Sequence, residues 1–370
     1  MSNIIKKQGK RKKLFIQKLM SAKQIFIYYI IICSGLCTTN CIGNKVNNPK
    51  KITTETWNNI SAYFKPPAIY ENKYGEYRSP LLPANGDSIK SASEWKKRRK
   101  EIKEEWMSLI GEWPPVITNQ KFEIINTLKR EDFYQYRVRF CWTPNEQTEG
   151  YLLIPDKRGK KPAVISVFYE PETAIGSGGK PNRDFAYQLT KRGFITLSLG
   201  TTQTTKEKTY SIYYPDINNA SIQPLSALAY AAANAWEVLA KVTEVDSTKI
   251  GIVGHSYGGK WAMFASCLYE KFACAVWSDP GIVFDETKGG YINYWEPWYL
   301  GYYTPPWKNT WNVKGYNTQK GVYSRLRKEK HDLHELHALM PPALFLFQAV
   351  FPTDRKDGYR SIIRYSSTDF

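Results

Sequence analysis

Short apolar runs rich in β-branched residues alternate with helix-like segments in the second half of the chain. Four such runs lie at residues 163–169, 194–200, 249–254 and 273–278. Segments with helical spacing of apolar residues lie between them, at residues 184–193, 226–242 and 258–268. Strands that are apolar on both faces are typical of a parallel sheet covered by helices on either side. The sequence therefore predicts an α/β fold with a mostly parallel sheet and helices on both faces.

Two kinds of element are expected before this pattern begins. Residues 95–109 place apolar side chains at helical spacing, with the basic run 96–100 on the other face, which predicts a helix with one solvated face. Two strands are expected around residues 134–142 and 150–154, with the polar segment between them forming a turn.

The formal net charge of +18 is concentrated at the start of the chain. Residues 1–23 hold eight Lys or Arg and no acidic residue, which leaves +10 over the remaining 347 residues. A nucleic-acid-binding protein is expected to show basic residues interleaved along one motif, and the sequence has no such motif. We therefore expect no nucleic-acid partner.

The basic start is followed by an apolar segment. Residues 25–36 are apolar apart from one Ser. About a dozen apolar residues after a basic stretch suit a secretion signal and are too few to span a bilayer. We expect a signal peptide over 1–43, with Met20 as a candidate start, and hence export to the periplasm, the medium or the cell surface. Cys37 and Cys41 are candidate sites for a lipid anchor, and plain cleavage is the alternative.

The motif GHSYG at residues 254–258 joins an apolar strand to a helix. A Ser on such a tight turn is pushed out above the sheet, and glycines avoid collisions with the neighbouring elements. Ser256 is therefore predicted to be a nucleophile, with the backbone N–H of Tyr257 facing an oxyanion. The loop after the first apolar strand, at Tyr169 and Glu170, is expected to supply the second oxyanion donor.

A Ser nucleophile needs an acid and a base. Asp279 follows the next strand directly and is the candidate acid, although an Asp before Pro also suits a simple turn. Asp285 and Glu286 are weaker candidates for the acid. His255 lies inside the motif and is expected to pack against, or line, the substrate pocket.

The other three histidines, His331, His334 and His337, have helical spacing. Three His on a helix could bind a metal, but surface or packing roles are commoner for this pattern. We expect no metal and no cofactor.

Residues 291–303 hold seven aromatic residues in thirteen, among them Trp295 and Trp298. This density favours a wall on which a sugar stacks, and an aromatic cluster beneath a long insertion is the alternative.

Together these segments resemble the α/β-hydrolase superfamily, of the dienelactone-hydrolase and carbohydrate-esterase type, and in parts the glucuronoyl esterases and acetyl xylan esterases. The resemblance covers residues 94–342 and rests on EWKKRR…WPP, GHSYGGKWAMFAS, the strand ending in SDPG, and HDLHELHALMPP. It implies that Lys260 contacts sugar hydroxyls and that Asp279 is the acid. Tyr257 departs from the glucuronoyl esterases, which have Arg there, so esters of uronic acids are less strongly implied and deacetylation fits as well. The expected divisions are then the signal peptide, an N-terminal arm over 44–93 and a hydrolase domain over 94–342.

The end of the chain departs from this family. The fold would require further strands and a loop that delivers a catalytic His, but residues 343–370 contain no His. With one choice of codons, a shift of one base near Gln348 turns QAVFPTDRKDGYRSIIRY into SGGFSDGSERWVPLNHSV. We therefore expect residues 343–370 to be a weakly ordered tail read out of frame, and this chain to be an inactive serine esterase. The alternative is a non-catalytic carbohydrate-binding protein of the same fold.

Overall fold

The computed structural model describes residues 88–179, 182–201, 211–216, 219–281, 283–284, 321–340, 343–352 and 359–365, with residues 58, 77, 79–82 and 86. The chain divides into two compact units, Met1–Asn58 and Asn59–Phe370, and the fold described below is that of the second. The expected signal peptide therefore lies outside the described residues. Within the described part of the chain, no helix is long and apolar enough to span a membrane.

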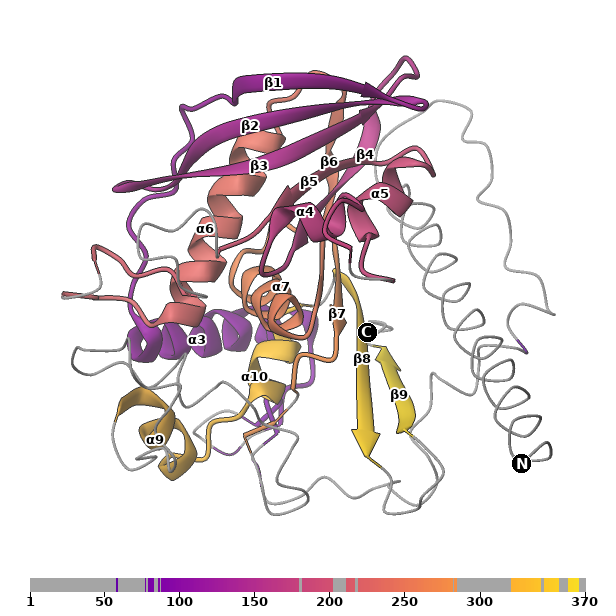
Figure 1. Ribbon diagram of the computed structural model, residues 1–370. Helices are drawn as coiled ribbons and strands as arrows, with labels where there is room; N and C mark the ends of the chain where they lie inside the picture. The colour runs from indigo at the N-terminus through magenta and orange to yellow at the C-terminus, as the bar shows by residue number, and fades with distance from the viewer. Residues whose placement is uncertain are drawn as a thin grey trace, which may run out of the picture. The chain divides into compact units, whose positions relative to one another are not determined.

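A nine-stranded sheet forms the centre of the second unit (Figure 1), in the order β1-β2-β3-β5-β4-β6-β7-β8-β9. Its strands are β1 Glu123–Arg130, β2 Phe133–Thr143, β3 Glu146–Pro155, β4 Lys161–Val167, β5 Ile195–Leu199, β6 Val245–His255, β7 Cys274–Ser278, β8 Leu344–Pro352 and β9 Tyr359–Tyr365. The helices are α3 Ala92–Ile110, α4 Pro171–Ala174, α5 Phe185–Thr190, α6 Pro224–Leu239, α7 Tyr257–Leu268, α9 Gly321–Lys328 and α10 Leu333–Ala338.

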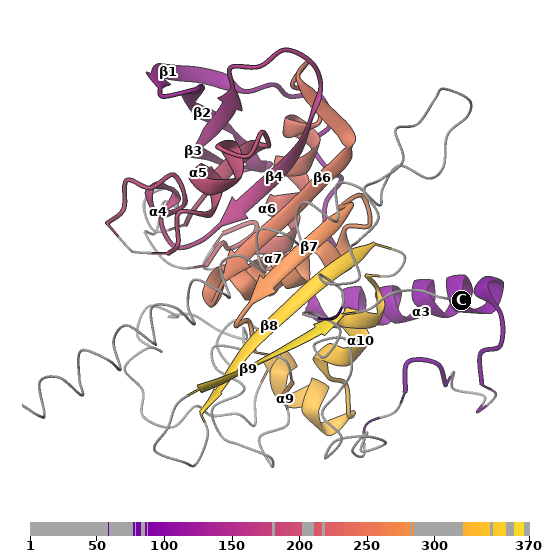
Figure 2. The same ribbon diagram turned by 90° about the vertical axis from the view of Figure 1, so that its right-hand side faces the viewer.

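Five neighbouring strands, from β5 through β4, β6 and β7 to β8, pair in parallel. Antiparallel strands extend this group at both ends, as Figure 2 shows. The predicted α/β class with a mostly parallel sheet is confirmed. The sheet is mixed because its first three strands form an antiparallel meander. The turn expected after residue 142 is shorter than predicted, since β3 already begins at Glu146.

Helices cover both faces of the sheet, as predicted. Leu152 of β3 packs in the main core with α6 and α7. Its neighbour Leu153 packs in a second cluster, with residues of α4 and α5. Successive side chains of a strand point to opposite faces, so these two clusters lie on opposite sides of the sheet. All sixteen residues of α6 are buried, and all but Ser226, Asn234 and Glu237 are apolar or aromatic.

The predicted helix near residue 95 is α3. Its N-terminus is capped by the Ser91 hydroxyl, which accepts a hydrogen bond from the Glu94 N–H at 3.3 Å. It ends at Gly111, whose φ of +95° is tolerated by glycine. Trp106 and Ile110 are buried, whereas Lys96, Lys97 and Lys100 of the basic run are exposed. Arg98 and Arg99 of the same run are half-buried, and Arg99 Nε donates to the Leu339 carbonyl at 2.8 Å, so only the lysines form a solvated helix face.

The start of the expected tail belongs to the sheet. Leu344–Pro352 forms β8, and its residues from Leu344 to Gln348 pair in parallel with β7. The expectation that order ends near residue 343 is therefore wrong for these residues. The physical reason is that this apolar run adds a strand beside β7 on which Phe345 and Leu346 are buried. The change of reading frame near Gln348 stays a prediction.

Candidate functional site

Ser256 lies on the turn between β6 and α7, as the motif predicted. Its backbone has φ +56° and ψ −117°, a conformation that costs a residue with a side chain about 1–3 kcal/mol. Two hydrogen bonds hold it there: the Ser256 N–H donates to the Ser278 carbonyl at 2.7 Å, and its carbonyl accepts from the Lys260 N–H at 3.1 Å. The strained turn places Ser256 at the carboxyl end of the parallel strands, where ligands bind in open α/β sheets.

Three glycines let the backbone close around this turn. A Cβ added to Gly254 would lie 2.0 Å from the Gly258 carbonyl oxygen. A Cβ on Gly258 would lie 2.0 Å from the Val167 oxygen, and one on Gly259 would lie 2.6 Å from the Ser278 oxygen. Real Cβ atoms do not approach oxygen so closely, so the glycines are required by the packing of the turn against β4 and β7.

Two of the predicted oxyanion residues, Tyr257 and Tyr169, contact each other, and the role of Tyr257, Tyr169 and Glu170 as oxyanion donors stays a prediction. Tyr257 begins α7, so its N–H belongs to the first turn, where N–H groups have no partner within the helix. Its ring is fully buried and stacks on that of Tyr169, with centroids 4.7 Å apart and an interplanar angle of 13°. The Tyr257 hydroxyl hydrogen-bonds the Thr201 hydroxyl at 3.0 Å. The Glu170 carboxylate accepts from the Thr173 hydroxyl at 3.2 Å, which ties that residue to α4.

Asp279 emerges next to Ser256, at the end of β7. The register pairs His255 with Ser278, so the residues that follow each of them leave the same edge of the sheet. Asp279 has φ +52°, an uncommon conformation for a residue with a side chain. Its position suits the acid of a triad, and this role stays a prediction. Asp285 and Glu286 lie outside the described residues.

Lys260 is fully buried beneath this edge. Burial lowers the pKa of its ammonium group, and the charge of Asp279 opposes that shift. The structure gives Lys260 no exposed surface and places it near Asp279. It therefore does not show the expected contact with sugar hydroxyls, which stays a prediction.

His255 is hydrogen-bonded to Ser278 and not to Ser256. Its Nδ1 lies 2.9 Å from the Ser278 hydroxyl. Burial, as the larger cause, and the nearby charge of Arg183, as the smaller one, lower the pKa of His255 to about 4, so its imidazole is neutral at pH 7. The Arg183 guanidinium lies 5.3 Å from the centre of the Phe168 ring. Arg183 was not among the predicted site residues, since no motif marks a lone Arg in a loop.

The three other imidazoles are held elsewhere. His331 Nδ1 lies 2.8 Å from Glu335, and that hydrogen bond raises the pKa of His331. His337 Nε2 lies 3.1 Å from the sulfur of Met263. Met263 follows Ser256 by seven residues, which is about 10 Å along α7. His334 meets the ring of Tyr77 edge-on, at 5.8 Å between centroids.

Within the described residues, which include all four His, no imidazole is hydrogen-bonded to Ser256. Among those same residues, no group of three or more His, Cys, Asp or Glu is placed to hold a metal ion. The aromatic segment with Trp295 and Trp298 lies outside the part of the chain that the structure describes, so its role as a sugar wall stays a prediction.

Comparisons with known proteins agree with this architecture. A model of the prolyl oligopeptidase family matches residues 231–340, which contain the turn at Ser256. No curated protein matches the chain. A glucuronoyl esterase from Solibacter usitatus has a similar structure, with a TM-score of 0.56 at 17% identity, over 75% of this chain and 80% of that chain.

A putative acetyl xylan esterase from Bacteroides fragilis is also similar. Its TM-score is 0.50 at 13% identity, over 83% of this chain and 78% of that chain. At such identities the likeness concerns the fold. Together with the matched segment and the strand–turn–helix geometry at Ser256, it shows that the chain has an α/β fold of the kind found in α/β-hydrolases.

Proposed function

We propose that this chain is built as a serine esterase for carbohydrate esters, acetyl or glucuronoyl, that forms an acyl-enzyme on Ser256. The strained backbone at Ser256, closed in by three glycines, is the observation that carries the proposal. A turn of this kind costs stability and is kept where it presents a nucleophile. In the reaction, a base takes the Ser256 proton as the Ser256 oxygen attacks the ester carbonyl, and the Tyr257 N–H stabilises the resulting oxyanion. The alcohol then leaves with that proton, and water releases the acid from the acyl-enzyme.

We further propose that these 370 residues catalyse the reaction poorly. A Ser hydroxyl is a weak nucleophile until a neighbouring base takes its proton. His255 bonds Ser278, and His331 and His337 are engaged with Glu335 and Met263. The fold thus supports a nucleophile, an acid at Asp279 and oxyanion donors, without an imidazole at the serine. Export is proposed as well, supported by the basic and apolar leader over residues 1–43.

A non-catalytic carbohydrate-binding protein is the second candidate, favoured by the same arrangement of the imidazoles. Such a protein would keep the fold and the sugar contacts while having lost the base.

Imidazole added to the buffer can replace the base and so separates these candidates. With imidazole present, we expect acetate release from acetylated xylan, or methanol release from a glucuronoyl methyl ester, that Ser256→Ala abolishes. Hydrolysis of an aryl acetate that depends on Ser256, without release from either carbohydrate ester, would remove the carbohydrate substrates from the proposal. No Ser256-dependent hydrolysis of any ester, with glycan binding intact, would favour the binding protein.

A further inference from the structure

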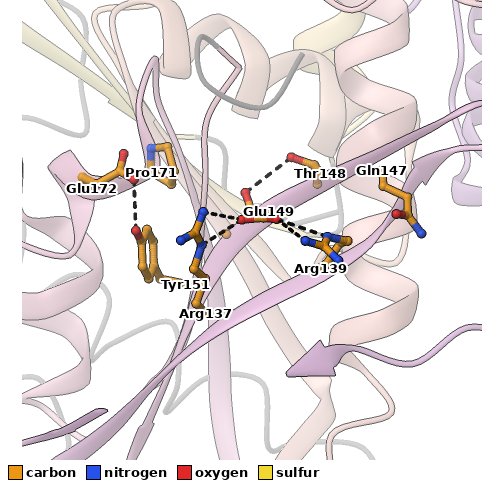
Figure 3. A pocket seen from close by; sticks show the side chains of 9 residues that line it. Arg137, Arg139, Gln147, Thr148, Glu149, Tyr151, Pro171 and Glu172 are labelled. Carbon is orange, nitrogen blue, oxygen red and sulfur yellow. Dashed lines mark hydrogen bonds and ion pairs between the residues drawn. The ribbon is translucent and has the colours of Figure 1, made fainter. Parts of the chain in front are cut away.

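A cavity of about 200 Å³ lies on the antiparallel part of the sheet, beside α4 (Figure 3). Its walls come from β2, β3 and the start of α4, and the residues that line it are Arg137, Arg139, Gln147, Thr148, Glu149, Gly150, Tyr151, Pro171 and Glu172. The side chains of Arg137, Arg139, Glu149 and Tyr151 occupy alternate positions of two paired strands, so they share one face. The polar walls of this cavity have no role in the proposed chemistry at Ser256.

Ion pairs fix the floor of the cavity. Arg137 Nη2 lies 2.6 Å from Glu149 Oε2, and Arg139 Nη2 lies 2.6 Å from Glu149 Oε1. Burial alone would raise the pKa of Glu149, but the hydrogen bonds from both arginines outweigh it and hold that pKa below its usual value. Glu149 is thus ionised at neutral pH and the two guanidinium groups are held in place before any ligand arrives.

Several polar atoms around this floor can still form further hydrogen bonds. Glu172 Oε1 accepts from the Tyr151 hydroxyl at 3.0 Å, whereas its Oε2 is buried and has no hydrogen-bond partner among the described residues. Among the residues that the structure describes, Arg137 donates to Glu149 alone, through Nε and Nη2. Within the described part of the chain, the Gln147 side-chain amide donates to the sulfur of Cys141 alone, at 3.8 Å. A buried carboxylate oxygen without a donor is costly, so this wall suits a ligand that brings hydroxyl donors.

The charges of the cavity balance. Arg137 and Arg139 contribute two positive charges, and Glu149 and Glu172 contribute two negative ones. An anion would meet as much repulsion as attraction here, whereas a neutral ligand with several hydroxyl groups can donate to the carboxylate and accept from the guanidinium. The Tyr151 ring adds an apolar surface beside these groups.

The cavity also adjoins the oxyanion loop. Pro171 and Glu172 follow Glu170 directly in the chain, and Tyr151 of the cavity pairs with Ser198 of β5. The Ser198 hydroxyl donates to the Pro171 carbonyl at 2.6 Å, which anchors the start of α4 to β5 beside the cavity.

From these features we infer that the cavity is an accessory subsite for one uncharged sugar residue of the glycan that carries the ester. The inference rests on the carbohydrate-directed function proposed above, in either its catalytic or its binding form.

The test measures binding of xylohexaose to the full chain carrying Ser256→Ala, by calorimetric titration. Glu172→Gln replaces the partnerless carboxylate oxygen while keeping the shape of the side chain, and should weaken the association constant about tenfold. Gln147→Ala should weaken it as well. Lys100→Ala, on the exposed face of α3, is the matched control and should leave binding unchanged.

Hydrogen exchange on the unsubstituted chain provides a second readout that needs no stable variant. Xylohexaose should slow amide exchange in residues 147–151 and 171–174. The subsite is refuted if the parent chain does not bind xylohexaose, if Glu172→Gln binds it equally well, or if those residues show no added protection. Tighter binding of free glucuronate or phosphate would also refute an uncharged ligand. Ser256-dependent ester release is a separate measurement, so the proposed function can fail or stand independently.

Discussion

Hydrolysis of an aryl acetate by this chain is expected to be no more than about tenfold faster than by its Ser256→Ala variant. Where serine and imidazole work as a unit, losing either one costs nearly as much as losing both, on the order of a million-fold in turnover. Since His255, His331 and His337 are hydrogen-bonded to groups other than Ser256, most of that loss is already present, and removing the serine adds little. Initial rates of both proteins, corrected for the buffer reaction, provide the measurement.

Melting temperatures of the two proteins serve as the control, because Ser256 is only half-buried and alanine should keep the fold. If the chain hydrolysed the aryl acetate a thousandfold faster than Ser256→Ala, it would have a working base, and the proposed lack of one would be wrong.

Gly258→Ala is expected to lower the free energy of unfolding by about 3 kcal/mol or more. The added methyl group would lie 2.0 Å from the Val167 carbonyl oxygen, so α7 and the end of β4 must move apart. Denaturation in urea, followed by tryptophan fluorescence, measures the change in stability.

Gly159→Ala is the matched control for this substitution. Gly159 has φ +94° and open space around its Cα, so alanine there suffers backbone strain without a collision, at a cost of about 1 kcal/mol. If both substitutions lowered the free energy of unfolding equally, the close approach of Gly258 to β4 would not be the cause of the loss.

The sequence predicted the elements whose pattern is local. Strands β4, β6 and β7 are apolar on both faces because helices cover both sides, and this shows as continuous runs. The turn at Ser256 was recognisable because the glycines that its packing requires lie within a few residues of the serine. The first strand, β1, was missed, since nearly all its residues are exposed and its polar and apolar residues do not alternate.

Contacts between distant segments could not be read in the same way. Arg183 reaches the surroundings of His255 from a loop about seventy residues earlier in the chain. The subsite beside α4 combines residues of β2, β3 and α4 that look like ordinary surface positions in the sequence. The pairing of LFLF with β7 joins segments about seventy residues apart in the chain, and no local pattern reveals that register.

Covalent labelling tests the role of Ser256 most directly. The full chain is treated with a fluorophosphonate ester in the presence of imidazole, digested, and mapped by peptide mass spectrometry. A single phosphonyl group on the peptide that contains Ser256, dependent on imidazole and absent from Ser256→Ala, is the predicted result. A label on another residue, or an unmodified Ser256 with imidazole present, would contradict the assignment of Ser256 as the nucleophile.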